Sequence, residues 1–164
     1  MLSSRQANGL PGVLLWNVAK LWQKHVHTAV APLGLSSTNA VILVNILHLS
    51  LEEQRISQTA VAELSNVDVM TTSSALRTLE KKQLVVRTMD TSDRRSNVLA
   101  LTAQGRETAL AAVDRLAHAH QQFFSVISSE QAHFSATLSL LLQKHGHTLF
   151  VNSDETINNT GEVT

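Results

Sequence analysis

The segment Thr88 to Gly105 constrains the fold of this chain more than any other. Two β-prone runs, Leu84 to Met89 and Asn97 to Leu101, enclose a charged, turn-rich stretch, Asp90 to Ser96. Strand-forming runs separated by Asp, Ser and Arg residues predict a β-hairpin with a basic tip. Thr102 follows directly and is a good N-cap, so the second strand should lead straight into a helix.

A helix-turn-helix is predicted just before this hairpin. Ser57 is a suitable N-cap for a helix from Gln58 to Leu64, and Ser65 to Asp68 form a tight connection into a helix from Val69 to Gln83. Two short helices joined by about four residues have the spacing of a helix-turn-helix.

The two faces of the Val69 to Gln83 helix differ in chemistry. Thr72, Leu76 and Leu79 are in phase to face a core, whereas Met70, Ser73, Ser74, Arg77 and Lys81 form the opposite row. Small hydroxyl side chains followed by Arg suit close approach to base edges and phosphates. The alternative is an ordinary polar helix face. Because the helix phase can be off by one position, Thr71 and Thr72 are kept as candidates too.

The positive charge of the chain is concentrated in one segment. The 164 residues have a formal net charge of zero, which argues against a protein that coats nucleic acid through bulk charge. Cations nevertheless gather between residues 77 and 95, where two adjacent arginines form the hairpin tip, although a solvated turn would also explain that pair. The residues expected to contact DNA are Thr71, Thr72, Ser73, Ser74, Arg77, Lys81, Arg87, Asp93, Arg94 and Arg95.

The flanking segments should be helical. We expect helices from Pro11 to Ala31, from Ser36 or Ser37 to Leu49, from Ala103 to about Ile127, and from Ser128 or Ser129 to Gly146, with a loop over Ser50 to Arg55. Two of them carry apolar residues at steps of three and four, more than one small core needs. These stripes are Leu14, Val18, Leu21, Trp22, His25 and Ala29, and Leu110, Val113, Ala117, His120, Phe124 and Ile127.

The predicted fold class is therefore mainly α, with a winged helix-turn-helix DNA-binding lobe over residues 36–101. Residues 10–32 and 102–147 would form a helical dimerisation region, and residues 152–164 a polar, disordered tail. The absence of cysteine excludes disulfides, thiolate zinc sites and thiol redox switches. Neither an export signal nor a membrane span is evident, so we expect a cytoplasmic protein without contact with a membrane.

The eight histidines raise the question of a metal site. Three pairs, His25 and His27, His118 and His120, and His145 and His147, are spaced i, i+2, which on a helix directs the two rings apart. We therefore expect core or interface histidines and no metal or other cofactor, with a site assembled between helices as the alternative.

The hairpin and its surroundings resemble the MarR family of bacterial transcriptional regulators. The likeness rests on Asp93-Arg94-Arg95, an apolar strand, and Leu101-Thr102-x-x-Gly105, extends back through Leu79 to Arg87, and covers roughly Leu10 to Gly146. The family usually has glycine where this chain has Gln83, so Gln83 implies either a strained residue or a different helix end.

The resemblance implies a homodimer joined by the first and the last two helices, a recognition helix in the major groove of double-stranded DNA, and a wing in the minor groove where Asp93 pairs with Arg95 and shapes the turn. It also implies a small-molecule effector, commonly an aromatic acid. Candidate ligand residues are Trp16, Lys20, Gln23, His27 and Asn39, although a partly buried Trp beside a solvated Lys explains the first two equally well.

The expected function is a sequence-specific repressor that binds a pseudo-palindromic operator and is released by its effector. Alternatives are a metal-responsive regulator of the same fold and a winged-helix protein interaction module. An enzyme is not expected, because the chain has no phosphate-binding glycine loop, nucleophile elbow or paired metal motif.

Overall fold

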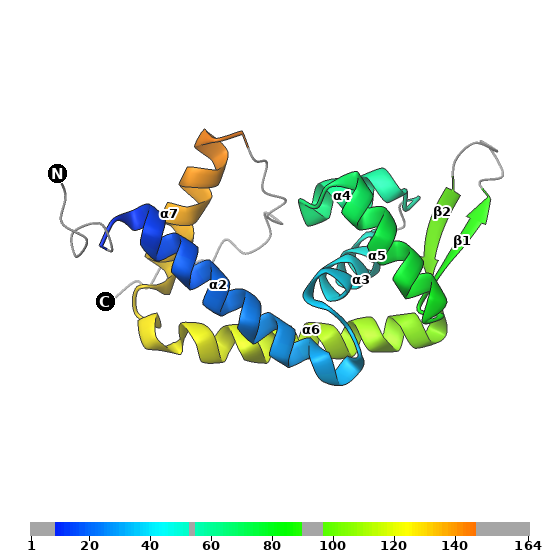
Figure 1. Cartoon of the computed structure of the whole chain (residues 1–164), viewed down its shortest axis with the longest axis horizontal. Coiled ribbons are helices and arrows are strands. Elements are labelled where there is room, and N and C mark those ends of the chain that lie inside the picture. Colours follow the sequence, from blue (N-terminus) through cyan, green and yellow to red (C-terminus); the bar gives the residue numbers. More distant parts are fainter. Residues whose placement is uncertain (1–8, 53–54, 90–96, 147–164) are drawn as a thin grey trace, which may run out of the picture. The chain divides into compact units, whose positions relative to one another are not determined.

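A computed structural model of the chain describes residues 9–52, 55–89 and 97–146 (Figure 1). It divides into two units, Met1–Val126 and Ile127–Thr164, each of which is described by itself. The elements in order are α2 (Pro11–Val30), the 3-10 turn η1 (Ala31–Leu33), α3 (Ser37–Leu51), α4 (Gln58–Ser65), α5 (Val69–Lys81), β1 (Val85–Met89), β2 (Asn97–Leu101), α6 (Ala103–Phe124), the 3-10 turn η2 (Ser125–Ile127) and α7 (Gln131–Lys144).

Side-chain caps set the starts of four helices. The hydroxyl oxygens of Ser36, Ser57 and Thr102 accept hydrogen bonds from backbone N–H groups in the first turns of α3, α4 and α6, and the carboxylate of Asp68 does so for α5. Each cap satisfies a donor that the helix itself leaves unpaired. The expected starts of these helices are confirmed.

Several helix boundaries differ by one to three residues from the sequence prediction. Helix α3 continues through Ser50, whose hydroxyl donates to the carbonyl of Leu47, so the expected loop is shorter. Helix α5 ends at Lys81 rather than at residue 83. Helix α7 begins at Gln131, two or three residues later than expected, because the Ser129 hydroxyl donates to the Glu130 carboxylate at 2.6 Å instead of capping a helix.

We call the part of the chain from α3 to β2 the α3–β2 lobe. Its core is built from fully buried Ile42 and Leu43 of α3, Leu76 and Leu79 of α5, and Leu99 of β2. Helix α6 closes this core with small side chains, and α2 contributes one valine. Small residues let a helix approach closely, so α6 forms part of the lobe core as well as of the helical region (Figure 1). The residues of α2 and α6 in this core are Val30, Ala109 and Ala112.

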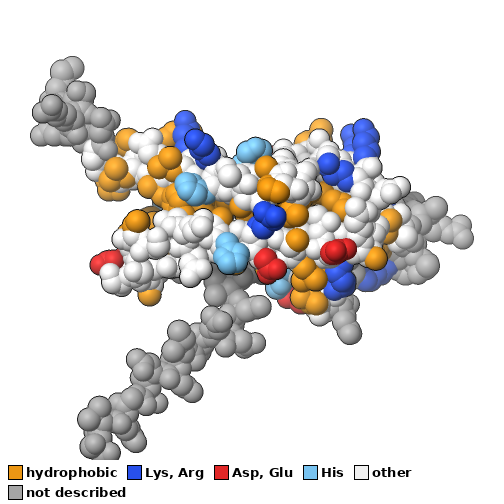
Figure 2. Space-filling model, turned by 90° about the horizontal axis from the view of Figure 1, so that it is seen from below, with side chains coloured by type: hydrophobic (Ala, Val, Ile, Leu, Met, Phe, Trp, Pro, Cys, Tyr) orange, Lys and Arg blue, Asp and Glu red, His pale blue; other side chains and the backbone are white. Residues whose placement is uncertain are grey.

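The apolar stripes of α2 and α6 are not the faces that this chain buries. Helix α2 buries Val26 and Val30, while Leu14 and Leu21 remain about half exposed. Helix α6 buries a row of small residues, whereas Leu110, in the expected seam, is 53% exposed. Figure 2 shows hydrophobic side chains at the surface of the molecule, interspersed with histidines and with lysine or arginine. The periodicity therefore identified apolar faces that a single chain leaves uncovered.

The second unit contains α7, which has no buried residue in this chain. Its exposed apolar side chains, Leu140, Leu141 and Leu142, are consecutive. Among the residues that the structure describes, no single helix is long and apolar enough to cross a membrane. One pair, Pro11–Leu33 with Ser37–Leu51, meets the length and composition limits jointly but is bent by 74°.

Candidate nucleic-acid interface

Helix α5 presents a polar outer face above a buried apolar base. Asp68 fixes its start, since its carboxylate accepts the Thr71 N–H at 2.9 Å. Hydrogen bonds from the Thr71 hydroxyl and backbone hold the pKa of Asp68 below its usual 3.8. The side chains of Ser74, Arg77 and Lys81 are exposed, and Ser73 is half-buried. This face carries hydroxyl groups and two cations on a helix that the lobe core holds in place.

Thr72 is a correction to the expected DNA-contacting set. Its side chain is 0% exposed, and its hydroxyl donates to the carbonyl of Val67 at 3.4 Å. The one-position uncertainty in helix phase is settled here in favour of a core position, because Thr72 shares the inward row with Leu76 and Leu79. A side chain without exposed surface does not reach DNA.

Arg87 is also held within the protein. It lies on β1, and its Nε is 2.9 Å from Oε1 of Glu80 on α5, while Nη1 donates to Oε1 of Gln58 on α4 at 3.3 Å. Both Arg87 and Glu80 are partly exposed, so the pair contributes little more than about 1 kcal/mol. Arg87 therefore links β1 to α4 and α5, the two helices of the helix-turn-helix. Its guanidinium group contacts protein side chains and does not extend outward toward DNA.

The two strands of the hairpin form an antiparallel pair in which Val85 lies opposite Leu101 and Thr88 opposite Val98. A third segment joins them, because the N–H of Leu99 donates to the carbonyl of Ile56 at 2.8 Å. The proposed tip residues Asp93, Arg94 and Arg95 lie outside the described residues.

A left-handed turn connects α5 to β1. Gln83 has φ of +58°, and the N–H groups of Gln83 and Leu84 donate to the carbonyls of Glu80 and Leu79. This pair of bonds is a Schellman helix end, which places its left-handed residue at Gln83. The sequence left open either a strained residue at position 83 or a different helix end, and the structure has the strained residue.

The same turn holds the start of α6. The Thr102 hydroxyl donates to the carbonyl of Gln83 at 2.7 Å, and its backbone N–H donates to that of Leu84. A Cβ added to Gly105 would lie 1.8 Å from the carbonyl oxygen of Leu84. The Leu-Thr-x-x-Gly sequence is therefore a docking element, in which Thr102 binds the turn and glycine permits its close approach.

The expected ligand residues do not come together around a cavity. Trp16 is 65% exposed, and the Lys20 ammonium lies 4.9 Å from the centre of its ring. Gln23 and His27 continue this exposed stripe, whereas Asn39 is buried in the first turn of α3. The arrangement is closer to the alternative of a helix side with a solvated Lys20, although Trp16 is more exposed than the partly buried tryptophan of that alternative.

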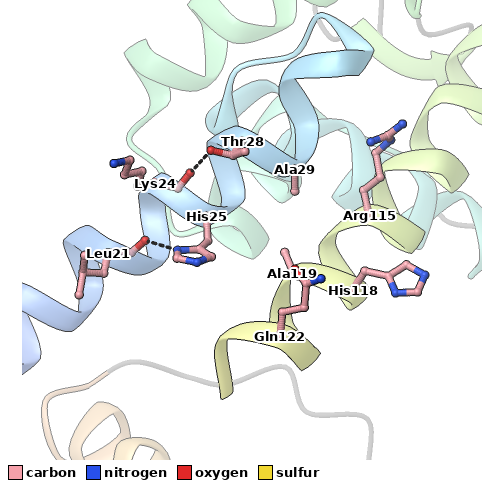
Figure 3. A pocket seen from close by; sticks show the side chains of 9 residues that line it. All are labelled: Leu21, Lys24, His25, Thr28, Ala29, Arg115, His118, Ala119 and Gln122. Atoms are coloured by element: carbon pink, nitrogen blue, oxygen red, sulfur yellow. Dashed lines mark hydrogen bonds between the residues drawn. The ribbon is translucent and has the colours of Figure 1, made fainter. Parts of the chain in front are cut away.

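A cavity lies elsewhere, between α2 and α6 (Figure 3). Its volume is about 520 Å³. Three lining residues of α2 were expected only as part of an apolar stripe, and none of the α6 residues was expected. The signal in the sequence was that polar residues of each helix recur at steps of three and four. The lining residues are Leu21, Lys24, His25, Thr28, Ala29, Arg115, His118, Ala119 and Gln122.

Two of the histidines, His25 and His120, pack against phenylalanine rings. The rings of His25 and Phe123 are 5.0 Å apart, and those of His120 and Phe124 4.7 Å. Among the described residues, no group of three or more His, Asp or Glu side chains is arranged to hold a metal ion.

Comparison with known proteins identifies relatives over most of the chain. A sequence model of the MarR family matches residues 35–97. The uncharacterized HTH-type transcriptional regulator YdcH of Bacillus subtilis is 31% identical over 134 residues, which are 82% of this chain and 91% of YdcH. The chain belongs to the MarR family of transcriptional regulators.

Solved structures of MarR-family regulators agree with this assignment. CouR from Rhodococcus jostii RHA1 bound to p-coumaroyl-CoA is 30% identical, with a TM-score of 0.68 over 86% of this chain and 94% of CouR. The Mycobacterium tuberculosis MarR family protein Rv2887, in complex with salicylic acid, is 28% identical, with a TM-score of 0.60 over 81% of this chain and 96% of Rv2887. The winged helix fold and the regulator class are thus established.

Gln83 occupies the position at which the family resemblance led us to expect glycine. The left-handed helix end is kept all the same, since the Schellman bonds and the contact with Thr102 are both present. The substitution therefore alters the cost of the turn and not its geometry.

Proposed function

We propose that this MarR-family regulator binds a pseudo-palindromic DNA operator as a homodimer, represses transcription, and is released by a small organic acid. The observation that carries the DNA-binding part is the outer face of α5, where Ser73, Ser74, Arg77 and Lys81 lie above buried Leu76. Helices that read the major groove combine hydroxyl and guanidinium groups in this way. Thr71, Arg94 and Arg95 complete the proposed contact set, with Asp93 shaping the wing.

Dimerisation accounts for the uncovered apolar faces. Leu14 and Leu21 of α2 and Leu110 and Val113 of α6 are exposed although they repeat at helical spacing. Exposed apolar side chains that share one face of a helix mark an association surface. A two-fold dimer would present two α5 helices to half-sites about one DNA turn apart.

Proposals about regulation draw on the relatives. One structure of CouR contains this repressor bound to a 23-mer DNA duplex, and another contains CouR bound to p-coumaroyl-CoA. The structure of Rv2887 contains salicylic acid. Ligand binding shifts a two-state protein only by its differential affinity for the two states. The effector must therefore bind the DNA-free arrangement of the dimer better than the DNA-bound one.

The test begins with selection of bound sequences from random duplex DNA, followed by titration of the chosen operator by fluorescence anisotropy at several salt concentrations. We expect Arg77→Ala to weaken binding by about 1–3 kcal/mol, and Arg95→Ala to reduce the steepness of the salt dependence by about one phosphate contact per copy. Lys20→Gln, a charge loss on the exposed side of α2, is the control and should leave both unchanged.

Two results would contradict the proposal. Unchanged affinity and salt slope in both arginine variants would remove the α5 face and the wing from the interface. Failure of the unmodified chain to bind random duplex DNA even at low salt would favour a protein interaction module instead.

A further inference from the structure

Met70 is an apolar side chain on the polar outer face of α5. It lies in the first turn of the helix and is 81% exposed, whereas the neighbouring Val69 is 57% exposed. Because an α-helix turns by about 100° per residue, Met70 is directed within about 20° of Arg77, which lies two turns further along. Met70 therefore belongs to the face that carries the proposed DNA contacts.

The core of the α3–β2 lobe makes no use of Met70. The inward row of α5 consists of Thr72, Leu76 and Leu79, each of which is 0% exposed, and Met70 lies on the other side of the helix. The other members of its own row are polar or charged, so none of them covers it with an apolar group. These members are Ser73, Ser74, Arg77 and Lys81.

The start of α5 is unfavourable for a phosphate. The carboxylate of Asp68 accepts the Thr71 N–H at 2.9 Å, which occupies one of the backbone donors that a helix N-terminus offers to anions. Its negative charge also repels a phosphate group. The cations of the outer face, Arg77 and Lys81, lie about two and three turns beyond Met70. The first turn of α5 is therefore suited to meet base edges, as in other helices that read DNA.

The chemistry of methionine restricts what Met70 recognises on a base. Its thioether has no hydrogen-bond donor and is only a weak acceptor, so it does not read the donor and acceptor pattern of a base pair. In the major groove, the apolar group that the bases present is the C5 methyl group of thymine. A flexible, polarisable side chain adapts well to contact with such a group.

We propose that Met70 determines specificity for thymine, by packing its side chain against the C5 methyl group of one thymine in each half-site of the operator. Ser73 and Arg77, on the same face, would read neighbouring bases through hydrogen bonds. The inference rests on the proposed function, because Met70 reaches a base only when α5 lies in the major groove.

The test removes the methyl group of thymine without changing a hydrogen bond. The operator selected from random duplex DNA is prepared with each thymine replaced in turn by deoxyuridine, in both half-sites. At one thymine of the half-site, fluorescence anisotropy should show that the unmodified chain loses about fourfold in affinity per methyl group removed. Met70→Ala should bind the thymine operator about as weakly, and deoxyuridine at that position should weaken its binding no further.

Val69→Ala is the matched control. Val69 is an exposed apolar residue of the same helical turn, but it is directed about 100° away from Met70 around the helix. This variant should keep the full sensitivity to deoxyuridine at the identified thymine. Thermal denaturation checks that both variants fold. Met70→Ala should not destabilise the chain, since Met70 is exposed and alanine has the higher helix propensity.

A second selection from random duplex DNA measures specificity directly. The Met70→Ala chain should select the same operator, except that the preference for thymine at the identified position is reduced. The preferences at other positions should remain, because the hydrogen-bonding side chains of α5 are unchanged.

Two outcomes would overturn the inference and leave the proposed function intact: operator binding that no deoxyuridine replacement weakens, or a deoxyuridine effect that Met70→Ala retains in full. Loss of the deoxyuridine effect in Val69→Ala as well would also contradict it, because the effect would then depend on the first turn as a whole. If the unmodified chain binds no duplex DNA in the selection, the proposed function fails and this inference fails with it.

Discussion

The α3–β2 lobe and the helices α2 and α6 use the same kinds of apolar residue in opposite ways. In the lobe, Leu76 and Leu79 are fully buried by elements of the same chain, whereas on α6 Leu110 and Val113 remain exposed. Both pairs repeat at helical spacing. The difference teaches that one chain is enough to bury the apolar core of the lobe. The apolar side chains on the outer faces of α2 and α6 would be buried only by contact with a partner.

Truncation of a leucine in each region should give the largest effect. Leu76→Ala removes a fully buried side chain and should lower the free energy of unfolding by about 2–5 kcal/mol at any protein concentration. Leu110→Ala should cost little in dilute solution but should reduce the gain in stability that higher concentration gives, because it weakens association. Urea denaturation at widely separated protein concentrations measures both. Equal losses of unfolding free energy by the two variants at high dilution would contradict this contrast between the two regions.

A methyl group at Gly105 should be nearly as damaging. Its Cβ would overlap the carbonyl of Leu84, so Gly105→Ala must displace either α6 or the turn, with an expected cost of about 1–3 kcal/mol. Gly12→Ala is the matched control, since nothing lies within 4 Å of its added Cβ in the first turn of α2. That change should be neutral or slightly stabilising in thermal denaturation. A similar response of the two glycines would show that α6 does not dock closely on the lobe.

Gln83→Gly should stabilise the chain by about 1 kcal/mol, because glycine adopts the left-handed conformation without the steric cost of a side chain. Asn66, at φ of +49°, is the control: asparagine tolerates this region better, so Asn66→Gly should change the stability less. Chemical denaturation compares the two. If Gln83→Gly destabilises the chain, the strain assigned to this turn is absent.

The smallest expected effect concerns the helix cap at Asp68. Its lowered pKa means that the ionised cap stabilises the folded chain above the usual pKa of 3.8, and that this contribution is lost as the pH falls through the lower folded value. Asp68→Asn keeps a capping oxygen but no charge, so the stability difference from the unmodified chain should shrink below pH 3.8. Urea midpoints across that pH range test this, and a constant difference would contradict it.

Short-range chemistry in the sequence is enough to predict much of the architecture. Ser57 and Thr102 accept the backbone N–H groups that make them caps, and Pro11 lies at the start of α2 as expected. The basic hairpin and the Leu-Thr-x-x-Gly sequence that follows it are sufficient to indicate the MarR family. These features depend on a residue and its neighbours within one turn, and a linear sequence displays such neighbours directly.

The position of a side chain relative to elements that are distant in the sequence is harder to infer from the sequence. The sequence leaves Thr72 both in the core row and among the DNA candidates, and the folded chain buries it completely. In the sequence Arg87 is one more cation of a basic patch, whereas in the fold it contacts Glu80 and Gln58. The cavity residues Lys24 and Arg115 are 91 positions apart, and no local pattern joins them.

By itself, the sequence determined the order of the elements, the caps, the hairpin and the family, because these follow from hydrogen bonds and steric limits among near neighbours. Tertiary structure alone decided which apolar faces are buried, which cations point outward, and that Gln83 adopts the left-handed turn. Burial depends on which distant elements meet, and the strained turn persists because the start of α6 binds it through Thr102.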